Sequence, residues 1–238
     1  MNMILFESSE RVAGDRNRIV LRGRRRGHII SVLRKSPGES CKVGELGGQI
    51  GRGVIAAVRA NEIELEVELF QPPPESAKVT IAAALPRPKS LRKVLHYGAT
   101  LGVKEFHFFG SFKVEKSYWQ TPFLESEYLN EQMYLALEQC VDTVPWKLHF
   151  HRFFKPFAED ILPGIATDAR LLVAHPCGAA ADLHAWRGEK ATVCLGPEGG
   201  FTDYEFELLR SLGAEPISLG ERILRTETAL AFLLGKLI

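Results

Sequence analysis

The chain has 238 residues, of which 45% are hydrophobic and 25% are charged, and its formal net charge is +1. This ordinary globular composition excludes a disordered chain, and no apolar run reaches the ~18 residues of a membrane span. The length predicts one or two domains. The four cysteines are dispersed and form no CxxC motif, so we expect a cytoplasmic protein without a disulfide framework or a bound metal.

Basic residues are concentrated near the start of the chain. Residues 11–35 contain eight arginines and one lysine against a single acid, Asp15. Arginine suits bidentate contacts with phosphate. A solvated arginine face is the alternative, but the density of charge favours a nucleic-acid partner.

Short strand-like runs follow, at residues 40–46, 52–58 and 61–69. Together with a short helix near residues 27–34, they predict a small antiparallel barrel. Residues 71–76 (QPPPES) predict a linker, because consecutive prolines cannot continue a helix or a central strand. We therefore expect domains at 1–72 and 77–238.

Strands and helices alternate after this linker. This rhythm predicts an α/β fold with a mostly parallel sheet that is covered on both faces and binds ligands at the carboxyl ends of its strands. The predicted strands are 78–85, 105–109, 147–150, 171–174, 192–195 and 216–219, and the predicted helices are 90–101, 125–140, 203–212 and 226–237.

Two short patterns are set aside. Residues 51–56 formally match GxGxxA, but a strand follows them instead of a helix, so hairpin turns explain these glycines better. His149 and His151 could form a metal pair on a strand, but no third ligand is evident.

The loop at 195–205 (LGPEGGFTDYE) is more informative. A buried strand leads into Gly196, Gly199 and Gly200, and a helix opened by Thr202 or Asp203 follows. Because the loop lacks the lysine of a phosphate-binding P-loop, it favours a flat, partly apolar ligand held by backbone groups. A plain strand-to-helix connection is the alternative.

The second informative loop is 218–229 (SLGERILRTETA). It carries Arg222 and Arg225, exposes Ile223 and Leu224, and precedes a helix that Thr226 could cap. A binding role explains this combination better than a charged helix start does.

The two loops together resemble the carboxyl-terminal signature of the RsmE family, which are bacterial 16S rRNA uridine-N3 methyltransferases of the knotted SPOUT superfamily. Weaker resemblances occur at 27–38, 87–103 and 137–140. The chain departs from the family pattern at Tyr97, Thr100 and Asp142, where the family usually carries lysine, glutamate and arginine residues.

The resemblance implies an N-terminal PUA-like β-barrel that binds RNA and a C-terminal SPOUT domain with a deep trefoil knot. It also implies S-adenosylmethionine as cofactor, the 16S rRNA of the small ribosomal subunit as partner, and a homodimer with its active site at the subunit interface. The alternatives are a SPOUT-type tRNA ribose 2′-O-methyltransferase and a non-catalytic RNA-binding protein.

Residue roles follow from the same resemblance. Arg225 would stabilise the negative charge that develops on the uracil oxygens or steer the RNA phosphate, and Glu227 would serve as base or as a structural cap. The cofactor would contact His175, Pro176, Leu195, Gly196, Pro197, Glu198, Gly199, Gly200, Leu219, Gly220, Ile223, Leu224 and Thr226. The RNA would contact Arg22, Arg24, Arg25, Arg26, Arg34 and Arg222.

Overall fold

The computed structural model describes residues 2–179 and 183–238, and it divides into two compact units. The first unit comprises the chain up to Pro74 together with Tyr134–Pro145, and the second comprises Glu75–Met133 and Trp146–Ile238. The first boundary falls within the predicted proline linker. The expected ranges differ from this division because they place residues 134–145 with the later part of the chain.

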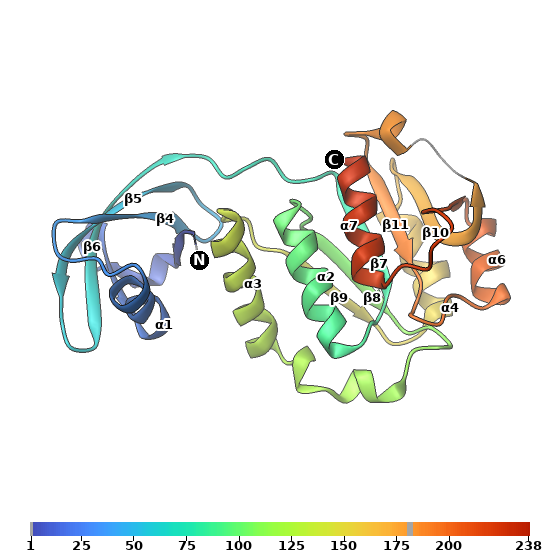
Figure 1. Ribbon diagram of the computed structural model, residues 1–238, viewed down its shortest axis with the longest axis horizontal. Helices are drawn as coiled ribbons and strands as arrows, with labels where there is room; N and C mark the ends of the chain where they lie inside the picture. The colour runs from blue at the N-terminus through green and yellow to red at the C-terminus, as the bar shows by residue number, and fades with distance from the viewer. Residues whose placement is uncertain (1, 180–182) are drawn as a thin grey trace. The chain divides into compact units, whose positions relative to one another are not determined.

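The first unit is built on one curved sheet of six strands (Figure 1). Its buried side chains come from alternate strand positions and from Ile29 of the helix, and they form one apolar core. The strands are β1 (Ile4–Phe6), β2 (Arg11–Val12), β3 (Asp15–Arg22), β4 (Ser40–Glu45), β5 (Ile50–Val58) and β6 (Glu62–Gln71), in the order β1-β4-β5-β6-β3-β2.

This sheet departs from the predicted antiparallel barrel in two ways. β1 pairs with β4 in parallel, and no pairing among the described residues joins the β1 edge to the β2 edge. The expected short helix is present as α1 (Gly23–Gly27) and a π-helical turn, His28–Val32. The strand β3 was not predicted, because its arginines mask the buried Ile19 and Leu21.

Residues 134–145 join the first unit through specific hydrogen bonds. The backbone amides of Asn2 and Met3 donate to the carbonyl of Glu138, and the Leu5 amide donates to its carboxylate at 3.2 Å. Further along, the Gly47 amide donates to the Thr143 carbonyl at 2.7 Å. These partners lie more than 90 residues apart in sequence, so local patterns could not predict them.

The second unit contains a fully parallel sheet, as predicted (Figure 1). The strand order is β12-β10-β11-β7-β8-β9. These strands are β7 (Val79–Ala84), β8 (Glu105–Phe109), β9 (Lys147–His151), β10 (Arg170–Ala179), β11 (Ala191–Leu195) and β12 (Glu215–Ile217).

Helices cover both faces of this sheet. α2 (Pro88–Thr100) and α7 (Thr226–Leu237) lie side by side on one face (Figure 1). α4 (Phe154–Pro156), α5 (Leu162–Ile165) and α6 (Asp203–Ser211) bury apolar side chains on the other. This arrangement brings the N-terminal ends of α6 and α7 close to the carboxyl ends of β10 and β11.

The remaining helical segments are one long helix, whose residues are divided between the two units, and several short turns. They are α3 (Ser126–Cys140) and the turns Ser8–Glu10, Lys116–Gln120, Pro122–Leu124, Phe157–Ile161 and Leu183–Trp186. In the described part of the chain, no helix combines the length and the hydropathy that crossing a membrane requires.

Candidate functional site

A cavity of about 300 Å³ lies beside the later part of β10, the end of β11 and the loop that follows β12. Its walls contain all thirteen residues that the sequence analysis assigned to a cofactor, so the structure brings the two informative loops and His175 together. Four residues that were not in that set also line it: Ala174, Phe201, Arg222 and Ala229. Of these, Arg222 had been assigned to RNA.

A second hollow, of about 850 Å³, lies at the opposite edge of the sheet, where the strands begin. Its rim carries charges of both signs, including Lys78, Asp168, Arg170 and Glu215. Parallel α/β sheets bind ligands at the carboxyl ends of their strands. The smaller cavity is therefore the better candidate.

The glycine loop enters helix α6 through a capping box. The Thr202 hydroxyl accepts a hydrogen bond from the Glu205 amide, and the Glu205 carboxylate accepts one from the Thr202 amide at 2.9 Å. Gly200, with φ of +72°, makes the sharp turn before this cap. Thr202 is thus the cap of the predicted helix.

A neighbouring loop supports the glycine loop from the side. Phe112 donates its backbone amide to Glu205 at 2.8 Å, and the Lys113 ammonium donates to the Gly199 carbonyl at 2.8 Å. The Phe112 ring itself is 84% exposed. The sequence analysis missed this loop because Lys113 and Gly199 are 86 residues apart.

The arginine loop forms the opposite wall. Gly220, with φ of +106°, turns the chain after Leu219, and Ile223 is 95% exposed at the rim. Arg225 occupies the N-cap position of α7 with an extended backbone and makes no side-chain cap. The expectation that Thr226 caps this helix is wrong, because Thr226 is the first helical residue and lies buried against the cavity.

Arg222 and Arg225 differ in their placement. Among the described residues that line the cavity, Arg222 is the one arginine, whereas Arg225 lies just beyond them with an exposed side chain. Both therefore flank the opening.

Glu227 points toward the neighbouring helix α2. Its carboxylate is 3.2 Å from the ammonium of Lys93, and the residue is only 5% exposed. Burial raises the pKa of this carboxyl, but hydrogen bonds from its own amide and from Lys93 outweigh that effect, so the pKa lies below its ordinary value. A carboxylate held this way packs helices together and is a weak proton acceptor.

His175 forms part of the cavity wall. Its ring stacks on Phe206 with centroids 4.0 Å apart, and its Nδ1 accepts a hydrogen bond from the Cys177 amide at 3.3 Å. Burial lowers the pKa of His175, and Asp203 opposes that shift only partly. The ring is therefore neutral at pH 7 and suited to packing against a ligand.

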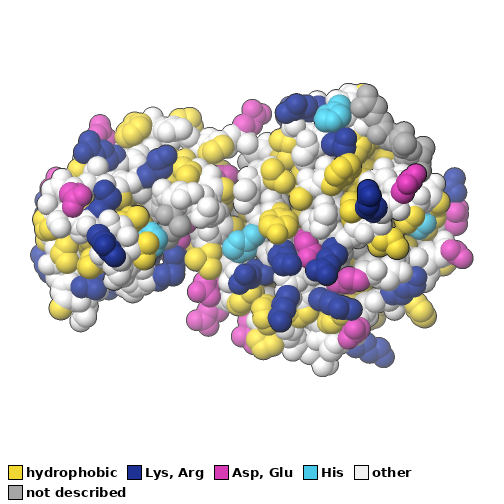
Figure 2. Space-filling view, in the orientation of Figure 1, with side chains coloured by type: hydrophobic (Ala, Val, Ile, Leu, Met, Phe, Trp, Pro, Cys, Tyr) yellow, Lys and Arg dark blue, Asp and Glu magenta, His cyan; other side chains and the backbone are white. Residues whose placement is uncertain are grey.

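A group of basic side chains, which we call the basic rim, gathers at the N-terminal ends of α2 and α7 (Figure 2). Helix α2 contains no acidic residue, and the acids that pair with these charges come from elsewhere in the chain: Glu227 pairs with Lys93, and Glu198 lies 3.9 Å from Arg87. The spacing of the basic residues along α2 could have revealed this face. The basic rim consists of Arg87, Lys89, Arg92, Lys93, Arg222 and Arg225.

The arginines predicted to bind RNA in the first unit are largely paired with other groups. Arg22 lies 2.6 Å from Glu62, Arg24 lies 2.8 Å from Glu138, and Arg25 lies 2.6 Å from Glu10. Arg26 donates to the carbonyl of Arg59. Arg34 is exposed, and the described residues offer it no ion pair. Acids from β6, from the turn Ser8–Glu10 and from α3 thus offset much of the predicted basic patch.

Comparisons with known proteins agree with this geometry. Residues 73–238 match the family model of the RNA methyltransferase domain. The chain is 28% identical over 241 residues to the ribosomal RNA small subunit methyltransferase E of Treponema pallidum, covering 96% of this chain and 87% of that protein.

Two solved structures share the fold. A methyltransferase structure from Legionella pneumophila with bound SAM covers 99% of this chain and 96% of its own, at 24% identity and a TM-score of 0.79. The ribosomal RNA small subunit methyltransferase E of Neisseria gonorrhoeae bound to S-adenosylmethionine covers 99% and 95%, at 20% identity and a TM-score of 0.74. Since the family model spans the whole second unit from its first strand to its last helix, the chain belongs to the RNA methyltransferase family.

Proposed function

We propose that this protein transfers a methyl group from S-adenosylmethionine to N3 of a uridine in the 16S rRNA of the small ribosomal subunit. The observation that carries the proposal is that the glycine loop and the arginine loop meet in one cavity at the carboxyl edge of the sheet. The relative from Treponema pallidum, which aligns along nearly the whole chain, is a ribosomal RNA small subunit methyltransferase.

The cavity fits this cofactor. Its volume lies within the range of small-molecule pockets, and its walls offer loop backbone, apolar side chains and one arginine. S-adenosylmethionine contains a nucleoside but no phosphate. It therefore needs loop backbone and apolar side chains around it more than it needs a cluster of cationic side chains. We assign Ile223 and Leu224 to packing on the adenine, with His175 and Pro176 closing the third side.

The bound cofactor supplies an activated methyl group on a sulfonium, so the protein mainly has to orient donor and acceptor. Uracil N3 would release its proton to solvent before it accepts the methyl group, and the negative charge of the resulting anion would spread over the neighbouring carbonyl oxygens. We assign Arg225, on the rim of the opening, to stabilising that charge. Glu227 takes a positioning role through Lys93, which its lowered pKa supports.

The RNA would meet two basic surfaces. The basic rim includes Arg222, which lines the cavity, and Arg22, Arg24, Arg25, Arg26 and Arg34 belong to the first unit. In this proposal the first unit is a PUA-like RNA-binding module, and phosphate contacts position the target uridine after it has left its stack.

The same proposal includes a deep trefoil knot in the second unit, a homodimer with a shared active site, and a cytoplasmic location beside the ribosome. Ile223 supports the dimer, since a large apolar side chain that is 95% exposed at a cavity opening calls for a covering surface. A fully active monomer in sedimentation at assay concentrations would contradict the shared site.

Two measurements test the function. Calorimetric titration with S-adenosylmethionine and S-adenosylhomocysteine should give micromolar affinity, about −8 kcal/mol. Incubation with small ribosomal subunits should then yield N3-methyluridine. A ribose 2′-O-methylated tRNA product would favour the alternative SPOUT activity, and folded protein without cofactor affinity would favour a non-catalytic RNA-binding protein.

The Arg225→Ala variant tests the assigned charge stabilisation. We expect methyl transfer to be lost, while affinity for S-adenosylmethionine stays within a few-fold, because the side chain does not line the cavity. Arg187→Ala, which removes an exposed arginine just before β11 begins, is the matched control and should stay active. Unchanged transfer by Arg225→Ala would refute the assignment.

A further inference from the structure

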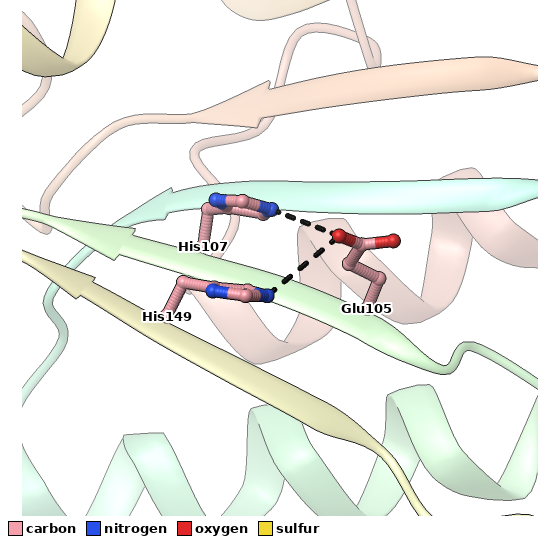
Figure 3. A group of neighbouring side chains, drawn as sticks. All are labelled: Glu105, His107 and His149. Atoms are coloured by element: carbon pink, nitrogen blue, oxygen red, sulfur yellow. Dashed lines mark hydrogen bonds and ion pairs between the residues drawn. The ribbon is translucent and has the colours of Figure 1, made fainter. Parts of the chain in front are cut away.

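A histidine and carboxylate cluster lies at the β9 edge of the parallel sheet, among residues that do not line the cofactor cavity. The register pairs His107 of β8 with His149 of β9, and Glu105 lies two residues before His107 on the same face. Figure 3 shows both imidazole rings with their Nε2 atoms toward the same oxygen of Glu105. The register thus supplies the partners that the sequence pair His149 and His151 lacked.

The ligand atoms are already at suitable separations. His107 Nε2 lies 3.3 Å and His149 Nε2 lies 3.7 Å from Oε1 of Glu105, and all three atoms lie within 4.8 Å of one another. A tetrahedral zinc ion bonded at about 2.0–2.2 Å holds its ligand atoms about 3.3–3.6 Å apart. The two imidazole rings are stacked, with centroids 4.3 Å apart and planes 15° from parallel, so rotations that turn both Nε2 atoms toward one point would complete the site.

Neighbouring groups hold His107 in an orientation suited to metal binding. The residue is 3% exposed, and its Nδ1 lies 3.0 Å from Nε2 of His151. Metal-bound histidines commonly make such a hydrogen bond through the second ring nitrogen, which fixes the ring and its tautomer.

The side chain of His149 provides the observation that points to a bound ion. Its Nε2 is buried, and none of the described residues gives that atom a hydrogen-bond partner. Buried polar atoms are almost always satisfied, so an orphan atom directed at a carboxylate indicates a missing partner. A cation between Glu105, His107 and His149 would satisfy all three side chains.

We propose that Glu105, His107 and His149 bind a divalent transition-metal ion, with Zn²⁺ as the best match to two imidazoles and one carboxylate. Glu105 and His149 are about two-fifths exposed, which leaves the fourth position to water and allows the ion to exchange. The bound ion would clamp the edge strand β9 to β8. This site adds to the proposed methyl transfer and does not depend on it.

The test is calorimetric titration of chelator-treated full-length protein with Zn²⁺, paired with visible absorption on titration with Co²⁺. We expect one ion per chain, an absorption band typical of a tetrahedral Co²⁺ site, and a melting temperature raised by several degrees with Zn²⁺. The proposal would be overturned if the protein bound no Zn²⁺. It would also be overturned if Zn²⁺ bound but Co²⁺ gave no tetrahedral absorption band.

Two variants locate the ion, and both change partly exposed side chains so that the fold is retained. Glu105→Gln and His149→Gln should each weaken Zn²⁺ binding at least tenfold, whereas the control His184→Gln, on a turn outside the sheet, should not change it. Equal affinity in all three would place the ion elsewhere. Affinity for S-adenosylmethionine should be the same in all of them, so failure of this site is distinguishable from failure of the methyltransferase.

Discussion

At the scale of the residue, Glu227 shows how a titratable group near a cavity can serve packing. Its carboxylate is buried and paired with Lys93 of α2. We expect Glu227→Gln to lower the free energy of unfolding by about 1 kcal/mol at pH 7, since Lys93 is half exposed and solvent weakens the pair. Urea titration monitored by circular dichroism measures this loss.

The pH dependence of that loss follows from the lowered pKa. The unfolded carboxyl has its ordinary pKa of 4.5 and binds a proton at a higher pH than the folded one does. Acid therefore favours unfolding, and the stabilisation is present above pH 4.5 and fades as the pH falls below it. The difference between wild type and Glu227→Gln should shrink in that window, whereas Glu221→Gln, on the exposed loop, should match wild type throughout.

Single residues of the cavity were predictable where their signal was local. Gly200 and Gly220 lie in the loops that follow the strands β11 and β12, and the arginine loop precedes a clear helix. Phe112 and Lys113 were not predictable, because only the tertiary fold brings their loop against Glu205 and Gly199. Glu105 and His107 escaped for the same reason, since strand register decides which side chains face His149.

At the scale of the element, the start of α6 determines the shape of the glycine loop. Thr202 caps the helix, and Glu205 binds both the cap and the loop at Phe112. Thr202→Ala should lower the free energy of unfolding by about 1 kcal/mol. The same measurement should show no loss for Thr100→Ala, at the end of α2, where no such cap exists.

The cap also has a consequence for the cavity. If the capping box holds the glycine loop, Thr202→Ala should weaken binding of S-adenosylmethionine several-fold even where the protein is fully folded. Calorimetry at low temperature separates this effect from unfolding. Unchanged affinity would mean that Lys113 and the turn at Gly200 suffice to hold the loop.

Element boundaries were predicted well because they depend on local chemistry, but membership of a unit was not. The helix α3 was expected at 125–140 and runs over Ser126–Cys140, yet its later residues cluster with the first unit. The buried carboxylate of Glu138, which receives the Leu5 amide, reflects this placement. The spacing of hydrophobic residues predicts which face of a helix is buried, but it does not predict which part of the protein packs against that face.

At the scale of the whole molecule, the distribution of charge was the least predictable property. The dense arginines of residues 11–35 suggested the main nucleic-acid surface, but the alternating strand β6 supplies Glu62 and Glu64, which pair with Arg22 and Arg18. Net charge along a segment ignores partners that arrive from another strand. The basic rim, by contrast, has six basic residues, and two acids, Glu198 and Glu227, form ion pairs with it among the described residues.

This contrast makes the basic rim the surface whose loss should change the salt dependence of RNA binding. Each phosphate contact contributes about 0.7–0.9 to the slope of log affinity against log salt. Replacing both Lys89 and Arg92 with glutamine should therefore lower that slope by about 1.5 and weaken binding to different RNAs about equally, because phosphate contacts carry no sequence information. The control replaces Arg187 and Lys190, near the opposite edge of the sheet, and should keep the wild-type slope. Equal slopes in both double variants would move the RNA away from the ends of α2 and α7 and return it to the first unit.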